Sequence, residues 1–148
     1  MGPRGAVKWL PLWLFSDTGL WLGLDDQARW VVGRMSGNMA VQDGQLLSPG
    51  WLPVLDHDEL TAREELSFSA DKYGLPAEQI LASLPIDDVI ALGLDSHSAH
   101  WSERALRWLE RRELRDDIRE MLPAVAESRA AGQRARQIAK RLMQQHRR

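Results

Sequence analysis

The sequence predicts an α+β fold, in which an N-terminal antiparallel β-meander of about three or four strands packs with a C-terminal group of four to six α-helices. Two observations lead to this prediction. Residues 7–55 hold aromatic and β-branched runs separated by turn residues, which is typical of strands. Residues 61–122 hold apolar side chains at intervals of three and four, which is typical of helices. We therefore expect one α+β domain over residues 1–122 and a basic C-terminal helix over 123–148.

The strand region has short segments and short connections. A turn is expected at 16–19, and connections of this length exclude parallel crossovers, so the strands should pair as an antiparallel meander. Residues 48–55 contain two prolines, which cannot donate to a sheet ladder, so this part should be irregular or lie at an edge. The expected strands are residues 8–15, 20–24 and 28–34, with a fourth at 39–42.

The first helix should begin at Thr61, because Thr61 and Glu64 have the spacing of a capping box. Gly74 is the residue that most easily ends it. Two short helices should follow over 76–84 and 86–94, although the second is short enough to be a strand. The apolar side of the first helix is formed by Ala62, Leu66, Ala70 and Tyr73.

The next helix follows several candidate N-caps within residues 95–98. Trp101 and Trp108 lie two turns apart on it, and we expect both indoles in the core. Its apolar pattern continues to Leu122, and Pro123 should mark either a break in the helix or the first turn of a new one. An alanine-rich stripe over 128–142 then has two candidate partners: the domain itself, or a second copy in a homodimer.

Composition narrows the class of protein. The chain has 148 residues, ordinary apolar and charged fractions and no cysteine, which excludes disulfide frameworks and thiolate chemistry. The apolar run at 9–15 contains Pro11 and is too short for a signal peptide. No segment approaches the roughly 20 apolar residues that span a bilayer. A soluble, cytoplasmic protein without a membrane partner is expected.

The charge is distributed unevenly along the chain. Residues 1–100 carry 6 basic and 14 acidic side chains, whereas residues 123–148 carry 7 basic and 1 acidic. The sequence therefore predicts an acidic body with a basic arm.

Motifs for catalysis or nucleotide binding are absent from the sequence. It has no glycine-rich phosphate loop, no G-x-S-x-G turn and no H-E-x-x-H helix. His97 and His100 could form half of a metal site on one side of a helix, but their spacing matches no specific metal motif. We therefore favour a non-catalytic protein without a cofactor, and keep an enzyme or metal-binding protein with a His97/His100 site as an alternative.

Five of the seven tryptophans lie in the strand region, where they can fill the core, contact a partner, or stack on sugars or bases. The first hypothesis is a small binding protein of bacterial type, such as an immunity or antitoxin-like antagonist. It would capture another protein, one of basic character, because opposite potentials speed encounter. The residues expected to form its acidic, tryptophan-containing surface are Trp13, Trp51, Asp56, Asp58 and Glu59.

The alternative hypothesis is nucleic-acid association through the basic C-terminal helix. Clustered cations can bind phosphates in a salt-sensitive way. The candidate residues are Arg129, Arg134, Arg136, Lys140, Arg141, Arg147 and Arg148.

Overall fold

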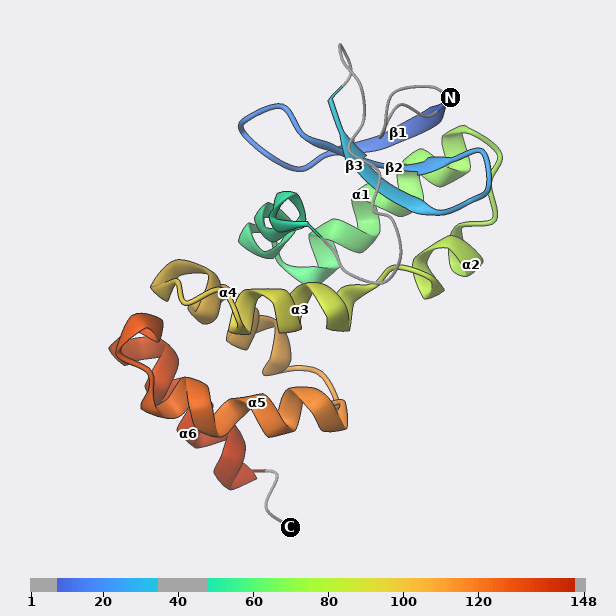
Figure 1. Ribbon diagram of the computed structural model, residues 1–148. Helices are drawn as coiled ribbons and strands as arrows, with labels where there is room; N and C mark the ends of the chain where they lie inside the picture. Colours follow the sequence, from blue (N-terminus) through green and yellow to red (C-terminus); the bar gives the residue numbers. More distant parts are fainter. Residues whose placement is uncertain (1–7, 35–47, 146–148) are drawn as a thin grey trace. The chain divides into compact units, whose positions relative to one another are not determined.

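The computed structural model describes residues 8–34 and 48–145 and has an α+β fold (Figure 1). Within these residues a three-stranded antiparallel sheet precedes six α-helices. This confirms the predicted fold class, and the strand expected at 39–42 lies outside the described residues. The chain divides into two compact units, Met1–Leu84 and Pro85–Arg148.

The sheet of the first unit is a meander in the order β1-β2-β3, with both neighbouring pairs antiparallel, as predicted. A register shift between Pro11 and Trp13 interrupts β1. Leu12 and Trp13 are consequently both buried, and the simple alternation of strand side chains is lost. A regular strand would point Trp9 and Trp13 to the same side, and the register shift between them removes that relation. The strands are β1 (Trp9–Leu14), β2 (Trp21–Asp25) and β3 (Trp30–Gly33).

The segment after the sheet, which was expected to be irregular or to lie at an edge, is helical in the structure. Residues Pro49–Asp56 form the 3-10 helix η1. Pro49 suits a first helical position because its missing N–H would have no partner there. The segment is fixed by burial of its apolar side chains, Trp51, Leu52, Val54 and Leu55.

Helix α1 (Glu59–Lys72) begins two residues before Thr61. The Asp58 carboxylate caps it by accepting a 2.7 Å hydrogen bond from the Thr61 N–H, so Thr61 is a donor to the cap and not the cap itself. Gly74, with φ of 71°, follows the last turn, as expected. Helix α2 (Ala77–Ala82) comes next, and the Trp30 indole N–H donates a 2.9 Å hydrogen bond to the Ser83 hydroxyl at its end.

The second unit is entirely helical among its described residues. Ser98 caps α4 by accepting a hydrogen bond from the Trp101 N–H. Helix α3 packs on α4, and α6 packs on both α5 and α4 (Figure 1). The elements are α3 (Ile86–Leu94), α4 (Ala99–Leu109), α5 (Asp116–Glu127), the 3-10 helix η2 (Arg129–Ala131) and α6 (Gln133–Gln145).

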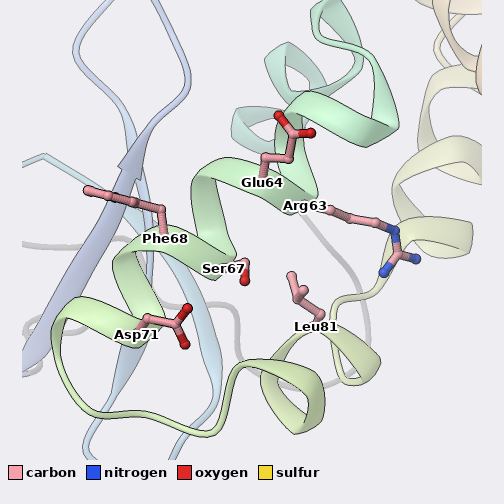
Figure 2. A pocket seen from close by; sticks show the side chains of 6 residues that line it. All are labelled: Arg63, Glu64, Ser67, Phe68, Asp71 and Leu81. Carbon is pink, nitrogen blue, oxygen red and sulfur yellow. The ribbon is translucent and has the colours of Figure 1, made fainter.

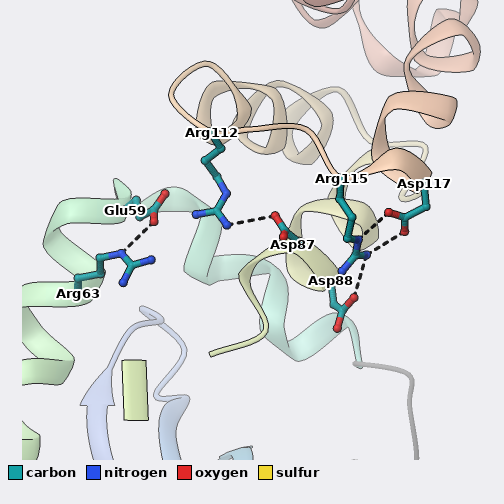
Figure 3. Close-up of polar contacts among 7 residues, drawn as sticks. All are labelled: Glu59, Arg63, Asp87, Asp88, Arg112, Arg115 and Asp117. Atoms are coloured by element: carbon teal, nitrogen blue, oxygen red, sulfur yellow. Dashed lines mark hydrogen bonds and ion pairs between the residues drawn. The ribbon is translucent and has the colours of Figure 1, made fainter. Parts of the chain in front are cut away.

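Helix α4 does not continue to Leu122, as the sequence pattern had suggested, but ends at Leu109. The connection to α5 is held by arginines that reach the first turn of α3. Arg112 lies 3.2 Å from Asp87, and Arg115 lies 3.0 Å from Asp88 (Figure 3). These ion pairs join residues about 25 positions apart, so the local spacing of apolar residues in the sequence could not predict them.

Pro123 lies inside α5 and does not break it. Its ring is exposed, so water can satisfy the Arg119 carbonyl that loses its helical partner. The domain boundary expected between residues 122 and 123 falls within this helix.

Helix α6 docks within its own unit. Its apolar side chains are buried against its own unit, which was one of the two candidate partners expected for this stripe. Those side chains are Ala135, Ile138, Ala139 and Leu142.

The two tryptophans of α4 differ in burial. Trp108 is 6% exposed, as expected for a core indole, whereas Trp101 is half-buried and forms a T-shaped contact with the His100 ring. Within the described part of the chain, the helices are all too short or too polar to cross a membrane.

Candidate functional site

Helix α1 presents an unusual outward face. Its inner side is buried through Ala62, Leu66 and Ala70, three of the four residues predicted for it, whereas the fourth, Tyr73, is 48% exposed because it lies at the C-cap beyond the last turn. The Ser69 hydroxyl donates a 2.6 Å hydrogen bond to the Leu12 carbonyl of β1, which fixes how the helix lies on the sheet. The opposite side of the helix therefore faces solvent.

Large apolar side chains are concentrated on that helix. Four are exposed among the described residues, and three of these, Leu60, Phe68 and Tyr73, belong to α1 or its C-cap. Phe68 is 71% exposed and Leu60 is 67% exposed. Solitary exposed apolar residues are ordinary, but Leu60 and Phe68 share one side of α1, and such a group is typical of an interaction site, whereas Tyr73 lies on another side of the helix.

A shallow pocket of about 450 Å³ lies beside Phe68, between α1 and α2 (Figure 2). We use the name α1 pocket for its lining residues: Arg63, Glu64, Ser67, Phe68, Asp71 and Leu81. Leu81, from α2, supplies a half-buried apolar wall, and the other five come from α1.

The α1 pocket is acidic in balance. Glu64 and Asp71 are exposed carboxylates, and the guanidinium of Arg63 is 2.9 Å from the Glu59 carboxylate on the preceding turn (Figure 3). Over residues 56–78 the chain has seven acidic side chains against two basic ones. A cationic partner is therefore favoured over an anionic one.

The two tryptophans that were expected on a partner-binding surface are buried in the structure. Trp13 is 6% exposed and Trp51 is 1% exposed, so both indoles are core residues. The Trp13 ring meets the His57 ring edge-on, and His57 Nε2 lies 2.7 Å from the Phe15 carbonyl oxygen.

The three acidic residues of that expected surface lie around the start of α1. Asp56 ends η1 and is exposed, Asp58 caps α1, and Glu59 pairs with Arg63. Two of the three therefore contribute to the local structure of the helix start.

The basic residues of the C-terminal arm are distributed over η2 and α6. Arg134 lies 3.5 Å from Glu103 and Arg141 lies 3.0 Å from Glu110, so two cations pair with acidic residues of α4 or its C-cap. Arg129 and Lys140 are exposed and Arg136 is half-buried. Arg147 and Arg148 lie outside the described residues.

His97 and His100 flank the start of α4. His97 precedes the cap with a positive φ of 56°, and His100 lies in the first turn. In the described part of the chain, no group of three or more His, Asp or Glu side chains is arranged to hold a metal ion.

Sequence reasoning missed Phe68, although a signal was present. On a helical wheel Phe68 falls on the polar side, across from Leu66. An aromatic residue on the polar side of a patterned helix is the observation that could have identified it.

No protein-family model, curated protein or solved structure matches this chain.

Proposed function

We propose that this chain is a non-catalytic binding protein that masks or tethers another protein of basic character. An immunity or antitoxin-like antagonist is one concrete form of this function. The observation that supports the proposal best is the exposure of Phe68 and Leu60 on the same helix face as Glu64 and Asp71. The α1 pocket thereby replaces the tryptophan surface expected from the sequence.

The chemistry of the α1 pocket suits a basic, partly apolar segment. An exposed phenylalanine beside a concave wall is a typical interface anchor, because its burial removes a large apolar area from water. The carboxylates of Glu64 and Asp71 would attract the partner's lysines or arginines. Such charges at the rim act mainly on the association rate and on the choice of partner.

The first test is capture of partners from the native host by the tagged, full-length chain, with nuclease present. We expect a basic protein at near-stoichiometric level. Phe68→Ala should reduce its affinity by about 10-fold or more, as truncation of an anchor does. Tyr73→Ala is the matched control, because it also removes an exposed aromatic from α1 but lies outside the α1 pocket.

The result is decisive in either direction. A stoichiometric basic partner that is lost with Phe68→Ala and kept with Tyr73→Ala supports the proposal. Absence of a stoichiometric partner, or one that binds both variants equally well, contradicts it.

Charge reversal tests the electrostatic part separately. Glu64→Lys and Asp71→Lys should slow association with the basic partner, and added salt should reduce the difference from the wild type. Glu65→Lys makes the same charge change at an exposed residue that does not line the pocket. Equal effects of all three variants would show that net charge, and not the α1 pocket, is responsible.

A parallel preparation without nuclease tests the nucleic-acid alternative. Material that nuclease removes and that has a high 260/280 nm absorbance ratio would favour the basic arm. Arg129→Glu and Lys140→Glu would then be the informative changes, because both side chains are exposed and neither belongs to the ion pairs of Arg134 and Arg141. Truncation after Pro123 is unsuitable, since it would cut α5 and remove the buried stripe of α6.

A further inference from the structure

A second pocket lies in the Pro85–Arg148 unit, where the loop between α3 and α4 meets α4, α5 and η2. Its volume is about 150 Å³. Leu94, Val125 and Ser102 form its buried side, and Asp95 and His97 stand at its open side. We refer to it as the Ser102 pocket, and it is independent of the function proposed for α1.

Ser102 is the first reason to regard this pocket as a ligand site. The residue is only 1% exposed and lines the pocket. Its backbone N–H is used in α4, donating to the Ser98 carbonyl at 2.9 Å, but its hydroxyl makes no hydrogen bond with any described residue. The hydroxyl is not one of the fully enclosed polar atoms that lack a partner, so it is reached from the pocket and can exchange a hydrogen bond with a molecule there.

The loop at the open side is held in a fixed geometry. The Ser96 hydroxyl donates a 2.6 Å hydrogen bond to the Gly93 carbonyl and accepts one from the Ser98 N–H at 3.2 Å. Between these serines His97 adopts a positive φ of 56°, a conformation uncommon for residues other than glycine. Asp95 and His97 are thus presented at the pocket by a constrained backbone.

Size and charge limit the class of ligand. A cavity of roughly 150 Å³ accommodates a molecule the size of benzene. The walls of Leu94, Met121 and Val125 suit an apolar ring. Asp95 carries the only carboxylate among the lining residues, and none of them is a lysine or arginine. A cation is therefore favoured at the open side, and a hydroxyl or similar group is favoured next to Ser102.

We propose that the Ser102 pocket binds a small monocyclic organic cation that has a hydroxyl group on its ring. The ring lies against Leu94, Met121 and Val125, the hydroxyl exchanges a hydrogen bond with Ser102, and the ammonium group faces Asp95.

The test is a titration of the ¹⁵N-labelled full chain with 4-hydroxybenzylamine, followed by amide chemical shifts. We expect saturable shifts at Asp95, His97, Ser102 and Ala131, with a dissociation constant below about 10 mM. This is the weakest affinity expected for a ligand of about nine non-hydrogen atoms with an ordinary binding free energy per atom. Benzylamine, which lacks the hydroxyl, should bind about fivefold more weakly. The anion 4-hydroxybenzoate should give no saturable shifts at these amides.

Variants assign the two polar contacts. Ser102→Ala should remove the difference between 4-hydroxybenzylamine and benzylamine, and Asp95→Asn should weaken both amines by about threefold, as for an exposed ion pair. Ala124→Leu should block binding by filling the open side, and Ala124 is exposed, so this change does not overpack the core. Absence of saturable shifts, equal binding of 4-hydroxybenzoate, or affinities unchanged in Ala124→Leu would overturn the proposal.

Discussion

The Leu10 carbonyl oxygen occupies the position that a side chain on Gly23 would need. A methyl group on Gly23 would overlap this oxygen and would lie only 2.9 Å from the Pro11 Cα atom. Gly23 is paired with Pro11 in the β1–β2 register, next to the register shift that interrupts β1. The close approach of the two strands thus depends on glycine at this position.

Gly23→Ala should therefore destabilise the chain by about 1 to 3 kcal/mol or more, because backbone atoms cannot move aside as a flexible side chain can. Urea unfolding followed by circular dichroism would measure the change. Gly50→Ala is the control, since a methyl group there meets only side-chain atoms, at 3.3 Å or more, and its effect should stay within about 1 kcal/mol. Equal stability of the two variants would contradict the backbone overlap.

Asp25 should make stability depend on acid pH. Its side chain is 1% exposed and accepts hydrogen bonds from the Gln27 and Arg29 backbone N–H groups and from the Arg29 guanidinium. Burial alone would raise the pKa of the Asp25 carboxyl. The Arg29 and Gln27 backbone N–H groups and the Arg29 side chain outweigh burial and lower this pKa below its ordinary 3.8.

A lowered pKa in the folded chain means that the charged carboxylate stabilises folding at any pH above the unfolded value. This contribution is lost as the pH falls through the lowered pKa. The difference in free energy of unfolding between the wild type and Asp25→Asn should be about 1 to 3 kcal/mol from pH 5 to 8 and shrink below about pH 4. Asp26→Asn, an exposed neighbour, is the control. A difference that stays constant down to pH 2 would show that the Asp25 charge is not involved.

The hydrogen bond between Trp30 and Ser83 should contribute a small, measurable coupling. It links β3 to the end of α2 across 53 positions of sequence. A double-mutant cycle with Trp30→Phe and Ser83→Ala should give a coupling of about 0.5 to 1.5 kcal/mol in the free energy of unfolding. Ser83 also donates to the Ile80 carbonyl, so only the cycle, and not Ser83→Ala alone, isolates the Trp30 contact. Additive effects of the two substitutions would show that the side chains of Trp30 and Ser83 are not energetically coupled.

Pro123 should be a source of instability in α5. A proline inside a helix removes one hydrogen bond and crowds the preceding turn. Pro123→Ala should therefore raise stability by about 1 to 3 kcal/mol, seen as a higher melting temperature. Pro76→Ala is the control, because Pro76 stands at the N-cap of α2, where proline causes no such loss. A melting temperature that falls or stays the same with Pro123→Ala would contradict this interpretation.

Local spacing alone determined a large part of this fold. The three strand positions, the meander, the end of α1 near Gly74 and the buried stripe of Ala62, Leu66 and Ala70 were all predicted from short stretches of sequence. These features depend on backbone preferences and on apolar periodicity over a few residues, so a single segment contains the information.

The tertiary structure decided those features that depend on contacts between residues far apart in the sequence. It buried Trp13 and Trp51, ended α4 at Leu109 through the packing and ion pairs of the second unit, and kept α5 helical through Pro123. It also left Phe68 exposed at a pocket that Leu81 lines as well, and it placed Ser102, Asp95 and Val125 around a second pocket. The physical reason is that burial and pocket shape depend on which elements pack together, and a residue's own neighbours in sequence do not specify that packing.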